Sequence, residues 1–364
     1  MMERRQIVRL WKQGSASVLV TLVRTEGSSY RRPGARLLLN HSGEYAGTIS
    51  GGCLEAEVVR KAAWMVRDGA RVERYSTMFD DTAEVPFGLG CGGVVDLLLE
   101  RADTPECAAL MQAMENALAA TKAVIVTWLP GEGKTLRRAV LVDGAVVFAS
   151  EALDDRKLQC AKELRLGQAY EGRFVEELRA PQRLFVLGAG DDAKPLVHMS
   201  SLLGWSVIVA DGRSQLAKAE RFPAAERVVA RVSESGIKAS DAVVVMTHSY
   251  EQDSEILTAL LPIAPRYLGV LGARHRSSLL LSEAAARTGL SVAECCQRIY
   301  APVGLDLGGD GPEAIALAVL AEAQAVCQGK LGAARRLTAD DVAHYVREGG
   351  AARYTPIHCA LDAS

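Results

Sequence analysis

The feature that most constrains this chain is a glycine turn that joins an apolar strand to a helix. The apolar segment Leu184–Leu187 ends at Gly188, which permits a tight turn, and Gly190 lets the backbone approach a bound phosphate closely. Ala193 takes the third small position, where the helix packs against the strand. Asp211 follows the end of the next strand, about twenty residues after the turn, where a carboxylate can bind ribose hydroxyls. This order predicts a dinucleotide-binding (Rossmann) unit.

The same alternation of strand and helix continues through the C-terminal half. The predicted strands are Leu184–Leu187, Val207–Ala210, Ala242–Met246 and Tyr267–Leu271. Pro312 then opens a long apolar helix that runs to about Cys327. Strands that alternate with helices are typical of a parallel sheet covered on both faces. We therefore predict an α/β protein with a Rossmann-like domain over residues 180–330.

The N-terminal half has a different pattern, in which short strands surround two helices. The predicted strands are Ser17–Val23, Ala35–Leu39, a short stretch ending at Gly47, Val72–Tyr75 and Val94–Leu99. The predicted helices run from Leu54 past Trp64 and over about 104–120, and a β-rich extension follows over 121–179. Gly133-Lys134-Thr135 resembles the end of a phosphate loop, but the glycine required five residues earlier is Trp128, so a hairpin turn is the better interpretation.

This pattern predicts an α+β domain over residues 1–179 and a C-terminal tail, 331–364, with one short helix at 339–347. The composition is that of a globular protein, with 49% apolar and 24% charged residues. A formal net charge of −2 argues against nucleic acid as a partner. The N-terminus lacks the apolar core of a signal peptide, and no apolar run is long enough to span a membrane. A cytoplasmic protein is expected.

Two of the eight cysteines lie in glycine-rich turns. Cys53 follows Gly51-Gly52 at the first turn of a predicted helix, a position that favours the thiolate, which is a nucleophile and a soft metal ligand. Cys91 lies within Gly90–Gly93, where exposed backbone amides let a ligand approach. Arg31 and Arg32 can add positive charge nearby, and buried structural thiols are the alternative. The other six cysteines fit core, helix or tail positions, and no CxxC pair indicates a zinc site.

These residues do not determine whether the Rossmann turn binds a ligand. Asp191 and Asp192 stand at the start of the helix and would repel a phosphate, so a Rossmann scaffold that does not use this turn is an equal alternative. A second, cationic turn over Gly272–Arg276 contains Arg274 and suits an anionic group, with a solvated helix start as its alternative. His248 and His275 are candidate site residues at strand ends, although such histidines are more often plain polar loop residues.

Taken together, these motifs resemble the XdhC/CoxI family, the xanthine dehydrogenase accessory factors. The resemblance rests on Gly27–Ala35, Gly51–Glu57 and Gly88–Gly93 in the N-terminal half, and on the Rossmann turn, Val244–His248, Leu268–Arg274 and Ala301–Gly308 in the C-terminal half. It extends from about residue 15 to residue 328. Tyr30 replaces the proline usual in the family, and Asp191-Asp192 replace a histidine and a small apolar residue.

The resemblance implies a cofactor chaperone rather than an enzyme. Such a protein binds the molybdenum cofactor (molybdopterin), protects it while a cysteine desulfurase supports its sulfuration, and delivers it to an apo xanthine dehydrogenase or a related molybdenum hydroxylase. The residues expected to bind the cofactor are Arg31, Arg32, Gly51, Gly52, Cys53, Glu55, Gly90, Cys91, Gly92, Gly93, Gly188, Gly190, Asp211, His248 and Arg274. Cys53 and Cys91 are the expected metal ligands, and a homodimer is the expected assembly.

Two other functions are compatible with the motifs. The first is an NAD(P)-dependent oxidoreductase in which Asp211 binds the ribose of NAD(P) or another nucleotide. In that enzyme His248 or Cys53 would act as the acid-base group or the nucleophile. The second is an interaction module that docks a hydroxylase without binding a ligand, as Asp191 and Asp192 at the turn would allow.

Overall fold

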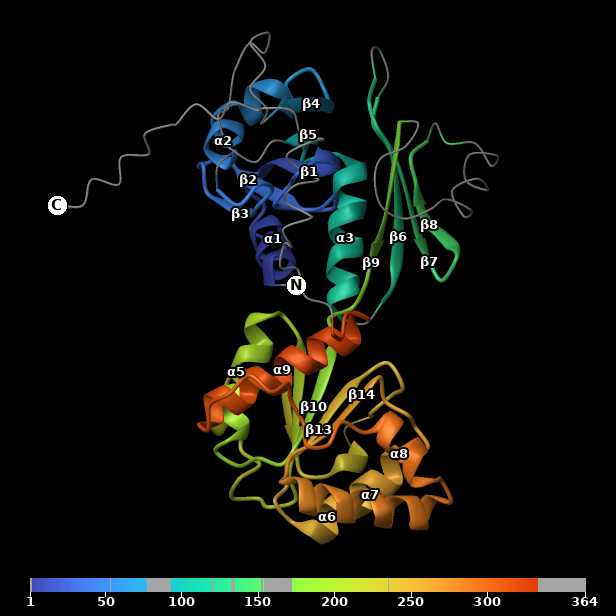
Figure 1. Ribbon diagram of the computed structural model, residues 1–364. Helices are drawn as coiled ribbons and strands as arrows, with labels where there is room; N and C mark the ends of the chain where they lie inside the picture. The colour runs from blue at the N-terminus through green and yellow to red at the C-terminus, as the bar shows by residue number, and fades with distance from the viewer. Residues whose placement is uncertain are drawn as a thin grey trace, which may run out of the picture. The chain divides into compact units, whose positions relative to one another are not determined.

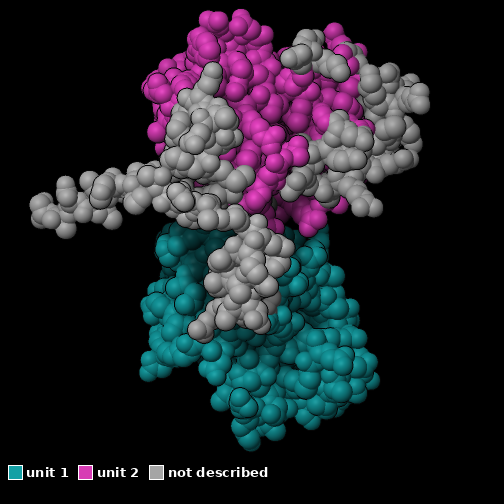
Figure 2. Space-filling view, turned by 45° about the horizontal axis from the view of Figure 1, so that its top comes forward, with its two compact units in different colours: residues 1, 181–336 teal, residues 2–180, 337–364 magenta. Residues whose placement is uncertain are grey.

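A computed structural model describes residues 2–52, 54–76, 93–119, 121–131, 135–151, 153, 172–234 and 236–332. The chain divides into two compact units, one of residues 2–180 and one that begins at Pro181 (Figure 2). We call them the N-terminal unit and the Rossmann unit, and each is described by itself.

The N-terminal unit is organised around a five-stranded antiparallel sheet in the order β3-β2-β1-β5-β4 (Figure 1). Its strands are β1 (Ala16–Gly27), β2 (Arg36–Asn40), β3 (Tyr45–Gly47), β4 (Arg71–Ser76) and β5 (Gly93–Arg101). Strand β5 and the middle of β1 are buried because apolar residues occupy both of their faces. Such strands need helices on both sides.

Three helices cover this sheet: α1 (Met2–Lys12), α2 (Glu55–Met65) and α3 (Pro105–Ala119). On one face, Val58 and Ala62 of α2 pack against apolar residues of β1, β2 and β5. On the other face, α1 and α3 enclose Leu19 and Leu38. The alternation of side chains along a strand separates these two cores.

A second antiparallel sheet in this unit has the order β8-β7-β6-β9. Its strands are β6 (Ala123–Trp128), β7 (Arg137–Val142), β8 (Ala145–Ala149) and β9 (Arg173–Leu178). A buried ion pair connects the two sheets. The two terminal nitrogens of the Arg138 guanidinium, Nη1 and Nη2, donate to the Glu100 carboxylate at 2.9 and 2.8 Å. Burial alone would lower the pKa of Arg138, but Glu100 raises it above its usual range.

The Rossmann unit contains a five-stranded parallel sheet in the order β12-β11-β10-β13-β14. Its strands are β10 (Arg183–Leu187), β11 (Ser206–Ala210), β12 (Arg227–Val229), β13 (Ala242–Val245) and β14 (Tyr267–Val270). The order reverses between β10 and β13, and open α/β sheets bind ligands at the carboxyl ends of their strands near such a point.

Helices cover both faces of this sheet (Figure 1). They are α5 (Ala193–Leu202) and α9 (Pro312–Cys327) on one face, and α6 (Tyr250–Leu260), α7 (Arg274–Thr288) and α8 (Val292–Arg298) on the other. Alternate residues of each strand serve the two cores: Val186 packs toward α5 and α9, whereas Phe185 packs toward α6 and α7.

The predicted fold class is confirmed, with an α+β module followed by a Rossmann-like parallel sheet. Helix α1 and strand β9 were not predicted individually from the sequence. The expected helix at 339–347 and the tripeptide motif at Gly133-Lys134 lie outside the described residues. Within the part of the chain that the structure describes, no helix is long and apolar enough to cross a bilayer.

Candidate functional site

The glycine loop before Cys53 is folded around the carboxylate of Glu55. The backbone amides of Ile49, Ser50, Gly51 and Gly52 donate to it at 2.9 to 3.2 Å. The hydroxyls of Thr48 and Ser50 also donate to it. We call this arrangement the Glu55 cradle. Its amides are therefore satisfied within the chain.

The local sequence explains the cradle. Gly51 and Gly52 have φ values of 98° and 120°, which glycine adopts most readily, and so the chain can curl its amides toward one point. Glu55 is the first residue of α2, where a carboxylate also interacts favourably with the helix dipole. Burial alone would raise the pKa of Glu55, but the bonds from Ser50, Thr48 and the backbone lower it to about 2. The cradle thus holds a charged carboxylate at neutral pH.

Two further predicted motifs meet beside this loop, at the end of β1. Gly27 pairs with Gly93, and a Cβ at Gly93 would collide with the carbonyl oxygen of Ser28. A Cβ at Gly51 would lie 2.8 Å from the Tyr30 ring. The turn after β1 therefore lies against both the Gly51 loop and the start of β5. The structure brings together the described flanks of the two cysteine loops.

The side chains of this turn differ in exposure. Tyr30 is 77% exposed, and Arg32 is also exposed. Arg31 is partly buried and pairs with Glu3 of α1. The turn thus presents an aromatic ring and a cation to solvent.

Four of the predicted cofactor residues, Cys53, Gly90, Cys91 and Gly92, lie outside the described residues. Of the cysteines that the structure describes, Cys107 and Cys295 are buried, Cys327 is half-buried and Cys296 is exposed. Burial raises the pKa of the Cys107 and Cys295 thiols, as expected for core residues. Across the described ranges, no group of three His, Cys, Asp or Glu side chains is placed to hold a metal ion.

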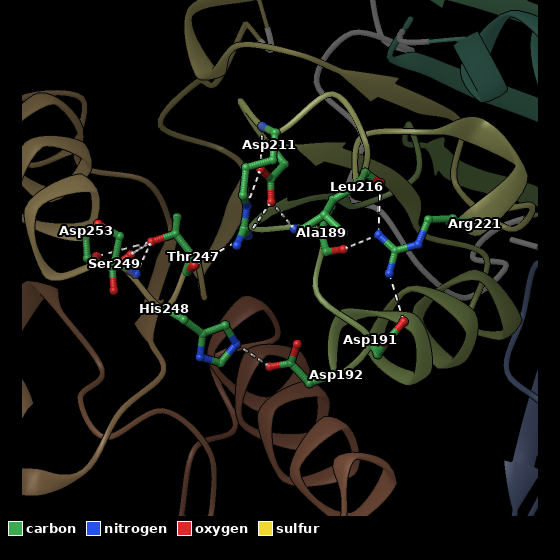
Figure 3. A network of polar contacts seen from close by, with 11 residues as sticks. Ala189, Asp191, Asp192, Asp211, Leu216, Arg221, Thr247, His248, Ser249 and Asp253 are labelled. Carbon is green, nitrogen blue, oxygen red and sulfur yellow. Dashed lines mark hydrogen bonds and ion pairs between the residues drawn. The ribbon is translucent and has the colours of Figure 1, made fainter.

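In the Rossmann unit, the glycine turn is formed as predicted. Gly188 has a φ of 126°, and a Cβ there would collide with the backbone of Met246, which follows β13. The carboxylate of Asp211 accepts a bond from the Ala189 amide at 2.7 Å and three bonds from Arg213 at 2.7 to 2.9 Å (Figure 3). Burial alone would raise the pKa of Asp211, but the bonds from Arg213 and the amide hold it below its usual range. The lone pairs that could take ribose hydroxyls are thus already in use.

The place where a phosphate would cross the turn contains a carboxylate of the chain itself. A Cβ at Gly190 would collide with Oδ1 of Asp192. The other oxygen of Asp192 lies 2.9 Å from Nε2 of His248, and Figure 3 shows the two side chains pointing toward one another. His248 has a φ of 65°, an uncommon backbone conformation for a residue other than glycine. We call this pair the Asp192–His248 latch.

Neighbouring polar groups are also paired within the chain. Arg221 donates to the Ala189 carbonyl at 2.7 Å and to Asp191 at 2.8 Å. Asp253, which is fully buried, accepts bonds from Thr247 at 2.6 Å and from Arg276 at 2.7 Å. Arg276 of the predicted cationic turn is therefore neutralised.

Arg274, the first residue of α7, is exposed and forms no ion pair with any described side chain. The structure brings Gly188, Gly190, Asp211 and His248 together at the strand ends. Asp192 and Arg221 were not among the predicted site residues. The two adjacent aspartates in the sequence could have indicated Asp192. The contacts of Arg221 depend on the tertiary fold and have no such sequence signal.

Two family models match the chain: one described as the XdhC and CoxI family, over residues 10–76, and one described as the XdhC Rossmann domain, over residues 184–323. The first match ends at β4 and includes the Glu55 cradle, and the second includes the Asp192–His248 latch.

Curated relatives are similar over most of their length. A protein of Bacillus subtilis that is named as a probable xanthine dehydrogenase subunit is 28% identical over 324 residues, which are 84% of this chain and 92% of the relative. The molybdenum cofactor insertion chaperone PaoD of Escherichia coli is 28% identical over 327 residues, 88% of this chain and 87% of PaoD.

A crystal structure of a protein from Bacillus halodurans, described as a xanthine dehydrogenase, has the same fold. It is 27% identical, with a TM-score of 0.77 over 93% of this chain and 99% of that chain. The motifs, the two family models and this structure agree, and the chain belongs to the XdhC/CoxI family.

Proposed function

We propose that the chain is an accessory factor that binds the molybdenum cofactor and hands it to a xanthine dehydrogenase-type hydroxylase. In this proposal the protein acts in the cytoplasm as a homodimer, and a cysteine desulfurase supplies sulfur while the cofactor is held. The names of the relatives from Bacillus subtilis and Escherichia coli support the general role.

The observation that carries the proposal is the meeting of three glycine motifs at the end of β1. Gly27 pairs with Gly93, and Tyr30 lies against Gly51. Each motif leads into or borders a cysteine loop. A fold that serves packing alone does not require two glycine segments that flank cysteines in the sequence to lie against one exposed turn.

The described residues fit a large, planar, anionic ligand at this turn. Tyr30 offers an exposed ring face, and Arg32 offers a cation without a partner among the described side chains. The cradle amides are not available to the ligand, because Glu55 uses them. Glu55 therefore acts as a positioning residue that holds the loop on one side of Cys53.

When bound, the cofactor supplies a soft, sulfur-rich metal centre for which thiolates are suitable ligands. In our proposal, Cys53 and Cys91 hold that metal, Arg32 binds an anionic group, and the Tyr30 ring covers the pterin. The turn at Gly188–Gly190 has no assigned part, since the Asp192–His248 latch occupies it.

The test is the metal content of protein purified anaerobically from cells that make the cofactor. We expect stoichiometric molybdenum, together with the fluorescence of the oxidised pterin, in the wild type and in Cys296→Ala. The Cys53→Ala, Cys91→Ala double variant is expected to lose both signals. Cys296 is the matched control because it is exposed on α8, in the Rossmann unit.

Unchanged molybdenum in a folded double variant would contradict the role of the two cysteines. Absence of molybdenum and pterin from the wild type would contradict the proposed function itself. Far-ultraviolet circular dichroism of each variant establishes that the fold is intact.

A further inference from the structure

The Rossmann unit contains an open pocket of about 630 Å³ beside the occupied glycine turn. Its lining comes from the end of β11, from the segment after β12 and from α6. The end of β11 and the start of α6, which follows β13, lie toward the carboxyl ends of the parallel strands, where open α/β sheets bind ligands. The volume is within the range of small-molecule sites. Asp211 is part of this lining and was among the residues expected to bind the cofactor, but the cofactor site proposed above does not use it.

The pocket has apolar walls. Val232 and Ile237 come from the segment after β12, while Ile256, Ala259 and Ile263 come from α6 and the turn after it. Ile256 and Ala259 are three positions apart on α6, so they lie on one side of the helix, and Ile263 adds an apolar side chain from the turn that follows. Ile263 is 39% exposed. Such walls suit the two faces of a flat ring.

Polar groups line the rest of the pocket. Gln252 and Glu255 of α6 are exposed and can donate and accept hydrogen bonds at a ring edge. Arg231 is exposed and forms no ion pair with any residue in the described part of the chain. Apolar walls with a few polar edge groups and an available cation match a nucleobase with a nearby phosphate.

The adjacent turn excludes one kind of nucleotide. In a dinucleotide site the pyrophosphate passes over the second glycine of the turn. Here the Asp192 carboxylate covers Gly190 and is held by His248. The Ala189 amide, a further possible donor, is bonded to Asp211. A pyrophosphate at this place would meet a negative charge and no free amide from Ala189.

We propose that the pocket between the segment after β12 and α6 binds the base of a mononucleotide, and that its phosphate is directed to Arg231 rather than over the glycine turn. The inference goes beyond the proposed function. It needs neither the cysteine loops nor molybdenum, so the two can fail separately.

The test is binding of AMP, GMP, CMP and UMP to the full chain without molybdenum cofactor, followed by calorimetry and saturation-transfer NMR. We expect at least one of them to bind saturably. Ala259→Trp fills the pocket from an exposed helical position and is expected to weaken that binding about tenfold or more. Ala286→Trp, at an exposed position of α7 that does not line the pocket, is the control.

Ile263→Glu is a second variant that places a charge in the apolar wall, and it should weaken binding in the same direction. No saturable binding by any of the four nucleotides would overturn the proposal. Equal binding by Ala259→Trp and Ala286→Trp would overturn the assignment of the pocket.

The dinucleotide NAD⁺ tests the role of the glycine turn. We expect the wild type to bind NAD⁺ no more tightly than AMP, and Asp192→Ala to improve NAD⁺ binding without improving AMP binding. Wild-type binding of NAD⁺ much tighter than that of AMP would show that the pyrophosphate crosses the turn and would overturn this part of the proposal.

Discussion

The two glycine turns of this protein both hold one of the chain's own carboxylates, but they do so in different ways. In the N-terminal unit, Glu55 is 3% exposed and accepts bonds from four backbone amides and two hydroxyls. In the Rossmann unit, Asp192 covers Gly190 and is held by the half-exposed ring of His248. The first carboxylate is part of the loop's structure, whereas the second is partly exposed and is held by a single side chain.

This difference shows that a glycine-rich motif in the sequence does not by itself indicate a bound ligand. Glycines let backbone amides converge, and the convergent amides can be satisfied by a ligand or by a nearby acid of the chain. At the Glu55 cradle the acid rigidifies a loop beside a cysteine. At the latch the acid lies over Gly190, at the place where a dinucleotide site holds its pyrophosphate.

The largest expected effect comes from removing the Glu55 carboxylate. Glu55→Ala leaves the amides of Ile49 to Gly52 without their acceptor, and we expect a loss of about 2–4 kcal/mol in the free energy of unfolding. Hydrogen exchange of those amides should accelerate more than exchange elsewhere. Glu57→Ala is the control, because its carboxylate pairs with Arg60 and Lys61 on the helix surface. Equal exchange at these amides in the wild type and Glu55→Ala would refute the cradle.

The pH dependence of the cradle follows from the lowered pKa of Glu55. A carboxyl whose pKa is lower in the folded state stabilises the protein fully above its unfolded pKa, here its usual value of 4.5. This stabilisation is lost as the pH falls from 4.5 toward about 2. We therefore expect the difference in thermal midpoint between wild type and Glu55→Gln to shrink over that interval. A difference that stays constant down to pH 2 would mean that Glu55 is not charged in the cradle.

A matched pair of glycine substitutions gives an intermediate effect. Gly51→Ala places a side chain at a φ of 98° and against the Tyr30 ring, so we expect a loss of about 1–2 kcal/mol. In Gly190→Ala the new methyl group contacts only the side chains of Asp192 and, farther away, His248, both of which can move. We therefore expect a loss of roughly 0.5 kcal/mol in the free energy of unfolding. Thermal unfolding of the two variants provides the measurement. A larger loss for Gly190→Ala would reverse the comparison.

The smallest effect is expected from opening the latch. Asp192→Ala removes a contact with the half-exposed His248 ring, and since many surface contacts of this kind contribute nothing measurable, we expect a loss of less than about 0.5 kcal/mol. The thermal midpoint should stay within about two degrees of the wild-type value. A shift as large as that of Glu55→Ala would show that the latch is structural.

Much of the fold could be predicted because buried strands carry strong apolar patterns. The runs at Val18–Val23 and Leu184–Leu187 are apolar on both faces, and they became the central strands β1 and β10. Helix α1 and strand β9 were not predicted separately. Helix α1 buries only Ile7, Val8 and Leu10 among charged residues, and the edge strand β9 contains two glutamates. Weak patterns of this kind depend on tertiary packing for their stability.

The positions of the glycine turns were predictable from the sequence, but the contacts made at them were not. The glycine motifs and Asp211 were identified from spacing. The occupation of the first turn by Glu55 had a local signal, since a glutamate at the start of a helix can bond back to the preceding amides. Only one partner of the latch could be identified from the sequence. Asp192 stands out because it precedes α5, whereas His248 follows β13 and contacts Asp192 only once the sheet has formed.

Molybdenum retention in Glu55→Gln and Asp192→Ala distinguishes the two glycine turns most directly. Both variants are purified anaerobically from cells that make the cofactor, and folding is verified by circular dichroism. If the Glu55 cradle positions the cofactor site, Glu55→Gln loses molybdenum while Asp192→Ala keeps the wild-type amount. Wild-type molybdenum in Glu55→Gln, or its loss from Asp192→Ala, would contradict the assignment of the cofactor to the cysteine loops of the N-terminal unit.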